Sequence, residues 1–163
     1  MISVINTWLT SLLDDADVPE ARVFTDAAEL AGNHPVPFAV LLVADEQVTR
    51  TGRRVGAEDS EDGTTRAVRW ELFSRRLPVQ LHLVLDSLAT AESVVDAALA
   101  AAFTGPSDSG NRWKVYCRGV GWPEKRSRLA TKVVVQLTFE FVSGVYRDCE
   151  IPLVTDVMPA PAT

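Results

Sequence analysis

The stretch Leu77–Leu85, LPVQLHLVL, decides the fold, because large apolar residues stand at every second position along it. Side chains two apart in a strand point to the same face, so this stretch predicts a strand with one apolar face. Lys132–Val142, KVVVQLTFEFV, has the same pattern, with Val133 to Phe141 facing one way and Gln136, Thr138 and Glu140 the other. We expect these two stretches to be the long strands of a sheet that is covered on one face.

Two amphipathic helices are predicted to cover that face. Residues 3–13 place Ile5, Trp8, Leu9, Leu12 and Leu13 on one stripe, with Ser3 as the N-cap and the helix ending before Asp14. Residues 91–103 form the second helix, with Thr90 as the N-cap. The expected buried stripe of this second helix comprises Val94, Val95, Ala98, Leu99, Ala102 and Phe103.

A long hairpin is predicted between the apolar run 37–44 and the first decisive strand. The run PFAVLLVA fits a central strand with both faces covered, and 46–51 and 67–73 fit two further strands. Residues 50–66 carry three glycines and mixed charges, which favours a hairpin tip or a mobile loop. After Gly144, which we expect to end the long strand, 145–154 predict one more.

The fold class is therefore α+β: a mainly antiparallel sheet, two principal helices packed on one face, and a long protruding β-hairpin. We expect residues 1–155 to form one domain, with the hairpin arm at about 46–73, followed by a flexible tail at 156–163. The length of 163 residues and the 47% hydrophobic content fit one globular domain.

Charge and motifs exclude several function classes. The net charge of −6 argues against a protein that wraps nucleic acid, because phosphate contacts need a basic surface. Trp113 and Trp122 do stand among basic residues, as in single-strand binders, but Trp113 fits a core strand face. The longest apolar run, 35–44, is too short to span a bilayer, and the N-terminus lacks the basic start of a signal peptide. We therefore expect a cytoplasmic site of synthesis and no membrane.

Catalytic and metal-binding patterns are missing from the sequence. His34 and His82 are the two histidines, and neither stands in a nucleophile or metal-ligand motif. Cys117 and Cys149 show no ligand spacing, so we expect two free buried thiols. The sequence predicts no catalytic residue, no metal and no cofactor.

Charge is distributed unevenly along the chain. Residues 1–49 hold eight acids and one base, whereas residues 112–132 hold seven bases and one acid. Such segregation permits copies to attract one another, although an ordinary solvated surface explains it equally well. The tentative interface residues are Arg50, Arg53, Arg54, Arg75, Arg76, Asp14, Asp15 and Asp17. We expect the hairpin bases to meet acids of another copy, so that reversing Arg53 and Arg54 weakens assembly and leaves the melting temperature nearly unchanged.

The order of these elements resembles the tail terminator, or tail completion, proteins of tailed bacteriophages. The segments that carry the resemblance are ISVINTWLTSLL, HPVPFAVLLVA, TTRAVRWELFSRRLPVQLHLVLDS, ATAESVVDAALAAAF and ATKVVVQLTFEF, which together span about residues 1–143. The ending SGVYRDCEIPLVTDV also looks like small proteins encoded among contractile-tail and baseplate genes.

The resemblance implies a structural virion protein located in the tail and assembled in the host cytoplasm. Such a protein forms a ring, usually a hexamer, on the end of the tail tube, stops tube growth and joins the tail to the head–neck connector. The implied partners are further copies, the tube protein, and possible sheath and connector proteins, with DNA passing transiently through an acidic or neutral lumen. A baseplate or neck component and, from another class, a small-ligand-binding or enzymatic α+β domain are the alternatives.

Overall fold

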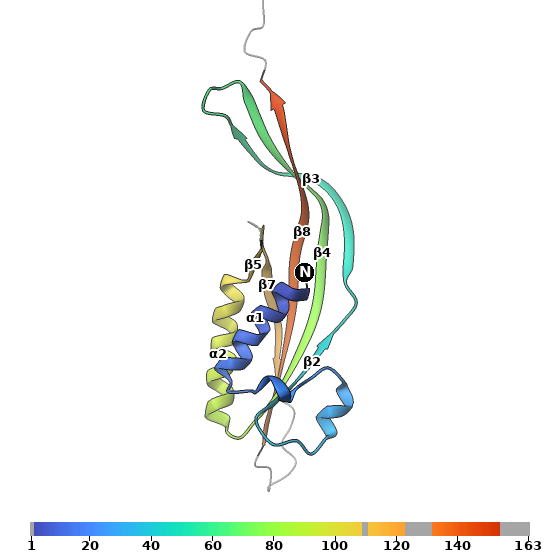
Figure 1. The fold of residues 1–163 in the computed structure, drawn as a ribbon, viewed down its shortest axis with the longest axis vertical. Helices are drawn as coiled ribbons and strands as arrows, with labels where there is room; N and C mark the ends of the chain where they lie inside the picture. Colours follow the sequence, from blue (N-terminus) through green and yellow to red (C-terminus); the bar gives the residue numbers. More distant parts are fainter. Residues whose placement is uncertain (1, 109–110, 123–131, 154–163) are drawn as a thin grey trace, which may run out of the picture. The chain divides into compact units, whose positions relative to one another are not determined.

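The computed structural model describes residues 2–108, 111–122 and 132–153 (Figure 1). The helices are α1 (Ile2–Asp15) and α2 (Leu88–Thr104), with short 3-10 helices η1 (Glu20–Arg22) and η2 (Ala27–Ala31). The strands are β1 (Val23–Phe24), β2 (Phe38–Val43), β3 (Gln47–Asp59), β4 (Thr65–Leu85), β5 (Ser107–Asp108), β6 (Asn111–Arg112), β7 (Lys114–Gly121) and β8 (Val133–Pro152). The chain divides into two compact units, the first made of 1–47 and 76–143, the second of 48–75 and 144–163.

The sheet of the first unit is mainly antiparallel. Its strands follow the order β1-β2-β4-β8-β7, and β5 and β6 form a separate pair. β2 runs antiparallel to β4, from Phe38 opposite Val84 to Val43 opposite Val79, and β7 runs antiparallel to β8. β1 alone is parallel to its neighbour, β2. The predicted α+β class is confirmed.

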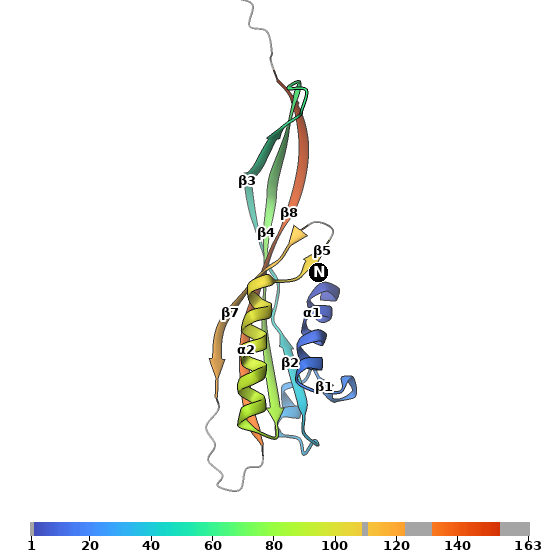
Figure 2. The ribbon, with the colours of Figure 1, turned by 90° about the vertical axis from the view of Figure 1, so that its left-hand side faces the viewer.

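Both helices pack on one face of this sheet, side by side (Figures 1 and 2). The alternating residues of β4 and β8 form the floor of the core, and Leu81, Leu83 and Phe139 are fully buried. Trp8 of α1 lies edge-on to Phe139 and Phe141, with ring centroids 5.3 and 5.4 Å apart. The two decisive stretches of sequence thus do bury the face that their alternation predicts.

A smaller cluster covers the opposite face. Phe38, Val40 and Val84 are buried there, under half-buried side chains that include Phe24 and Leu30. η2 begins at Asp26, whose carboxylate accepts a hydrogen bond from the Ala28 amide at 2.9 Å. Because β2 is buried by cores on both faces, the prediction of a central strand at 37–44 is confirmed.

The second unit is a three-stranded sheet made of β3, the first half of β4 and the last part of β8. The turn between β3 and β4 is closed by a bond from the Ser60 amide to the Thr65 carbonyl, 2.9 Å long. The Leu153 amide donates to the Thr64 carbonyl at 2.8 Å, which fixes β8 beside β4. All of β3 is exposed, and Val68 and Glu71 are the buried residues among those described in this unit.

The helix boundaries differ from the sequence prediction. α1 begins at Ile2 rather than after Ser3 and includes Asp14. After the helix, the Val18 side chain is buried in the core. The Val18 amide donates a hydrogen bond to the Leu13 carbonyl at 3.0 Å, which caps the C-terminal end of the helix. α2 is capped by Ser87 instead of Thr90, since the Ser87 hydroxyl accepts from the Thr90 amide.

Two strand boundaries are also corrected. β4 is one strand over 65–85, where the sequence suggested two separate ones at 67–73 and 77–85. β8 runs through Gly144 to Pro152, although we expected Gly144 to end it. A Cβ at Gly144 would stand 2.5 Å from the Tyr146 ring and 2.9 Å from Glu71 Oε1, so this glycine makes room for neighbours within the strand pair.

Two residues assigned to the buried stripe of the second helix lie outside it. Leu99 is 43% exposed and Phe103 is 93% exposed. The residues that α2 does bury are Ala91, Val94, Val95, Ala98 and Ala102. The stripe is therefore narrower than predicted, because small alanines let the helix lie close to the sheet. The predicted tail at 156–163 lies outside the described residues.

Candidate interaction surfaces

The hairpin sheet, defined as residues 48–75 and 144–153, contains a buried charge. The Glu71 side chain is 5% exposed and accepts a hydrogen bond from the Arg53 guanidinium. Thr51 Oγ1 donates to the backbone carbonyl of Glu71 at 2.8 Å. The hydrogen bond to Glu71, supported by its charge, raises the pKa of Arg53 above its ordinary value. A buried carboxylate is tolerated where a cation pairs with it, so Arg53 is tied to its own chain.

A polar network continues from Glu71 across the same sheet. The Arg69 guanidinium lies 4.7 Å from the centroid of the Tyr146 ring, and its Nε is 3.6 Å from Asp148 Oδ1. Tyr146 in turn packs over Gly144. These contacts join β4 to β8 by cation–π and ionic attraction in a sheet that has little apolar core.

The tip of the hairpin is held by its own side chains. The Asp62 carboxylate accepts hydrogen bonds from the Ser60 hydroxyl at 2.5 Å, the Thr64 amide at 3.0 Å and the Thr64 hydroxyl at 2.8 Å. These bonds, the one from Ser60 first, lower the pKa of Asp62 to about 2. Arg66 and Asp59 form a two-pronged ion pair just below, with bonds of 2.5 and 3.0 Å. The segment predicted as a tip or mobile loop is thus a strand and a tight turn.

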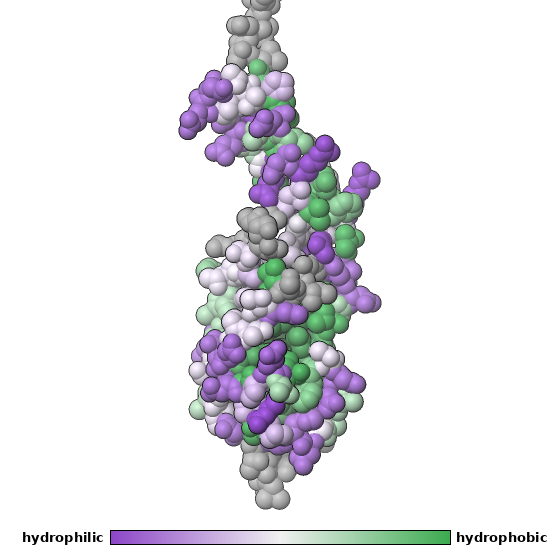
Figure 3. Space-filling view, in the orientation of Figure 1, coloured by the Kyte–Doolittle hydropathy of each residue, from purple (hydrophilic) through white to green (hydrophobic). Residues whose placement is uncertain are grey.

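Large apolar side chains are exposed on the hairpin sheet. They are Val48, Val55, Trp70, Phe73, Val145 and Ile151. The second unit contains no α-helix among its described residues, and β3 and the end of β8 are the edges of its sheet. Figure 3 shows green hydrophobic residues at the surface beside purple hydrophilic ones in this part of the chain. Exposed apolar side chains beside open strand edges are typical of a surface that another chain covers.

The structure places the predicted interface bases in different environments. Arg50 and Arg54 of β3 are exposed and form no ion pair with the described residues. Arg75 is half-buried, and Arg76 lies 3.6 Å from Glu140 Oε1 in the first unit. Arg53 and Arg76 therefore have carboxylate partners in their own chain, and the role of the five bases at an interface stays a prediction.

The predicted acids lie together at the end of α1. Asp14, Asp15 and Asp17 are all exposed, and Asp17 has a positive φ of 53° where the helix ends. These three acids belong to the first unit. The prediction pairs them with the hairpin bases of another copy, not with those of the same chain. Their pairing with another copy stays a prediction.

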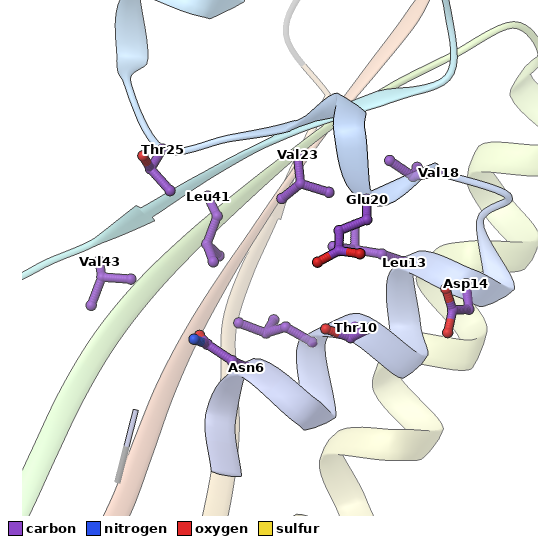
Figure 4. A pocket seen from close by; sticks show the side chains of 11 residues that line it. Asn6, Thr10, Leu13, Asp14, Val18, Glu20, Val23, Thr25, Leu41 and Val43 are labelled. Carbon is purple, nitrogen blue, oxygen red and sulfur yellow. The ribbon is translucent and has the colours of Figure 1, made fainter. Parts of the chain in front are cut away.

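An open groove, which we call the α1–β2 groove, lies between α1 and the β1–β2 edge of the first unit (Figure 4). It has a volume of about 550 Å³. Its floor is apolar and its rim is polar; the lining comprises Asn6, Leu9, Thr10, Leu13, Asp14, Val18, Glu20, Val23, Thr25, Leu41 and Val43. Asn6 and Asp14 lie at opposite ends of the groove, and Val23 and Leu41 point toward α1.

The rim of the α1–β2 groove has two carboxylates, Asp14 and Glu20, and no basic residue lines it. Val43 is 49% exposed, whereas Leu9, Leu13 and Leu41 are buried. The groove can therefore receive an apolar side chain, and its charge favours a cation beside that side chain.

The histidines and cysteines do not form a reactive cluster. His34 Nε2 lies 2.7 Å from Glu29 Oε2 and packs on Phe24, with ring centroids 4.3 Å apart. His82 is half-buried in β4, and burial lowers its pKa from the ordinary 6.5. Cys117 and Cys149 are free and half-buried, which corrects the expectation of two buried thiols.

Neither a metal cluster nor a membrane-spanning helix occurs in the part of the chain that the structure describes. No three His, Cys, Asp or Glu side chains there are grouped to hold a metal ion. No helix among those residues is both long and apolar enough to cross a membrane.

The comparisons with known proteins give matches among solved structures and none among family models or curated sequences. Among solved structures, the chain is similar to one in a structure described as "Virion of native gene transfer agent (GTA) particle", with 13% sequence identity and a TM-score of 0.44 over 88% of this chain and 93% of that chain. A TM-score at this level does not establish a common fold, so the function proposed below rests on the residues of this chain.

The sequence did not reveal the groove or the exposed phenylalanine of α2. Val18, Val23 and Val43 come from three short segments that no periodicity connects. Leu99 and Phe103, by contrast, stand four residues apart, which places both on one flank of a helix. The buried stripe of this helix consists of valine and alanine. The spacing of Leu99 and Phe103 is therefore the sequence feature from which a second, exposed apolar flank could have been predicted.

Proposed function

We propose that this chain is a structural protein of a phage-like virion, and more closely a tail terminator that caps the tail tube as a ring. The observation that carries the proposal is the hairpin sheet, a unit that has no α-helix among its described residues, exposes large apolar side chains and has β3 and the end of β8 as its two edge strands. Such a sheet is a liability in a monomer, since its edges offer unpaired backbone groups to other strands. It is suited to a protein whose working state is an assembly.

The polar network of the hairpin sheet supports the same proposal. Glu71, Arg53, Arg69 and Tyr146 hold the three strands together by pairing and stacking rather than by an apolar core. This leaves Trp70, Phe73 and their apolar neighbours at the surface, where another subunit can cover them. An arm stabilised in this way keeps its shape before it meets a partner, which lowers the entropy cost of assembly.

The more specific proposal, a tail terminator, combines the resemblance of the sequence to phage tail terminator proteins with the way in which tail tubes grow. Identical subunits that add head to tail leave an open interface at the end of the tube. Growth stops when a different protein binds that end without presenting the same interface again. A chain with an assembling sheet on one unit and a helix-covered sheet on the other has the two kinds of surface that this task needs.

The proposal includes no enzymatic activity. The described residues hold no metal cluster, His34 is engaged in an ion pair with Glu29 and in packing on Phe24, and His82 is half-buried in β4. The α1–β2 groove is the feature that favours the alternative class, a ligand-binding domain. Its lining combines apolar residues with polar ones such as Asn6, Thr10 and Glu20, as ligand pockets do, so the experiment below has to separate the two classes.

The test is a tube-growth assay with a purified tail tube protein. Purified protein is first sized by chromatography with light scattering, and is then added to polymerising tubes whose lengths are measured by electron microscopy. A terminator shortens the tubes at substoichiometric ratio and binds at one end. A baseplate component instead increases the number of tubes by starting them, and a ligand-binding domain leaves their length and number unchanged.

A further inference from the structure

We propose that Phe103 of one copy inserts into the α1–β2 groove of the next copy, so that this contact joins neighbouring subunits head to tail. The inference rests on the proposed function only in assuming that copies assemble. It names the two surfaces of the first unit that meet and the residues that anchor them.

The Phe103 side chain is almost fully exposed to solvent, which is unusual for a large aromatic residue. It is 93% exposed, the largest fraction among the exposed large hydrophobic residues described. It stands in the last turn of α2, one helical turn after Leu99, which is 43% exposed on the same flank. An aromatic side chain that becomes buried at an interface contributes strongly to binding, and such residues are enriched among the anchors of interfaces.

The α1–β2 groove offers a matching receptor. Leu9, Leu13 and Leu41 lie buried at the base of the groove, and Val43 at its edge, which is 49% exposed, is the apolar side chain most open to a partner. The volume of about 550 Å³ admits a phenylalanine side chain with room for the neighbouring helix turn.

Charge on the two surfaces is complementary near the proposed contact. Asp14 and Glu20 line the groove, whereas Lys114 of β7 lies beside Phe103 in a shallow depression at the end of α2. Seating Phe103 in the groove brings a cation to an acidic rim, which favours this pairing over a pairing of two grooves. Asp96 and Glu92 lie about two and three turns before Phe103 in α2, so the acidic part of this helix is separated from the proposed contact.

The positions of the two surfaces favour head-to-tail assembly. The groove lies at the β1–β2 edge and Phe103 lies by β7, at the opposite ends of the strand order β1-β2-β4-β8-β7. Figure 2 shows β7 and α2 on one side of the first unit and α1 and β2 on the other. Because the two surfaces lie at opposite ends of the sheet, the proposed contact is heterologous, and it closes into a ring where the rotation between neighbouring copies allows.

The experiment measures self-association of the full chain by sedimentation and light scattering. Phe103→Ser removes the anchor, Val43→Glu blocks the groove, and Ala100→Ser on the outer face of α2 is the matched control. We expect each of the first two variants to raise the dissociation constant of self-association by about tenfold or more, and the control to match wild type. All four proteins should retain the circular dichroism spectrum of a folded chain, since the three changed residues are exposed.

Mixing the two defective variants gives a sharper result. Phe103→Ser keeps an intact groove and Val43→Glu keeps an intact Phe103, so an equimolar mixture should form heterodimers that grow no further. Lys114→Glu and Glu20→Lys should each weaken association, and the double variant should recover part of it. Association of Phe103→Ser equal to wild type would overturn the proposal, as would a mixture that fails to pair while both variants remain folded.

The outcomes separate this inference from the proposed function. If Phe103→Ser assembles normally and still stops tube growth, the contact is wrong and the terminator proposal stands. If wild type self-associates through Phe103 and has no effect on tubes, the contact is right and the terminator proposal fails.

Discussion

The Arg53 guanidinium donates a hydrogen bond to the Glu71 carboxylate, from β3 across to β4, in a unit that has no α-helix among its described residues. The Arg53 side chain is 68% exposed, whereas that of Glu71 is 5% exposed. The exposed Arg53 therefore stabilises the fold by balancing the negative charge of the buried Glu71 carboxylate. This gives a specific role to one of two adjacent arginines that look equivalent in the sequence.

We predict that Arg53→Met destabilises the protein and that Arg54→Met does not. Loss of Arg53 leaves the Glu71 charge without its cation in a buried site, which costs more than loss of an exposed ion pair. Arg54 forms no ion pair with the described residues, so its loss is the matched control. Thermal unfolding followed by circular dichroism measures the difference. Equal melting temperatures for the two variants would show that solvent, rather than Arg53, compensates Glu71.

The same pair revises an expectation drawn from the sequence. Reversing Arg53 and Arg54 to glutamate was expected to leave the melting temperature nearly unchanged, on the premise that both are free surface residues. A glutamate at 53 would instead stand beside the Glu71 carboxylate, and like charges repel. We now expect the double reversal to lower the melting temperature, so Arg54→Glu alone is the cleaner test of an interface role.

Gly105 provides a second prediction about stability. It follows α2 with a positive φ of 63°, and a Cβ there would lie 2.3 Å from the carbonyl oxygen of Trp113. Gly105→Ala therefore combines a strained backbone with a clash against another main chain, and we expect a loss of about 1–3 kcal/mol or more. Gly119→Ala is the control, because nothing lies within 4 Å of its would-be Cβ. Chemical denaturation of both variants measures the difference, and a mild effect at Gly105 would mean that the connection after α2 shifts easily.

The third prediction about stability concerns the pH dependence that His82 causes. Burial lowers its pKa in the folded state below the ordinary 6.5, so the fold prefers the neutral ring. Its contribution is complete above pH 6.5 and is lost as the pH falls through the folded-state value, because the unfolded chain takes up the proton first. Urea unfolding at several pH values should show stability falling below 6.5 in wild type and a shallower fall in His82→Gln. Parallel curves for the two proteins would contradict this role.

The sequence predicted the core of the first unit well, for a physical reason. Alternation in Leu77–Leu85 and Lys132–Val142 reports directly which face is buried, and each residue carries its own part of the signal. Helix α1 was recognised for the same reason, since its apolar stripe repeats over several turns. Periodicity is local, so it survives in a single sequence.

The structural features that could not be predicted from the sequence depend on contacts between residues that are distant along the chain. Gly144 looked like a strand end, yet it lies within β8 because Tyr146 and Glu71 need the space. The middle of β4 at Ser74–Arg76 is polar, so nothing in its pattern joins the two halves of that strand. The α1–β2 groove collects Val18, Val23 and Val43 from separate segments, and its existence depends on how those segments pack.

The last prediction concerns β3 as the edge that assembly covers. β3 pairs with β4 on one side, and all of its residues are exposed, so the amides that face away from β4 should exchange rapidly in the free subunit. In an assembly that covers this edge, the same amides should become protected. Hydrogen exchange with peptide-level mass spectrometry at low and high protein concentration measures both states.

Amides of Val40 and Leu81, where β2 pairs with β4 in the core, are the internal control and should stay protected throughout. Comparison with Phe103→Ser separates the two proposed surfaces, since loss of that anchor should remove the concentration-dependent protection of β3 by preventing assembly. If wild type associates while β3 exchanges as fast as in the free subunit, then the hairpin edge stays open in the assembly. In that case copies meet through the first unit, and the edge is left for a different protein.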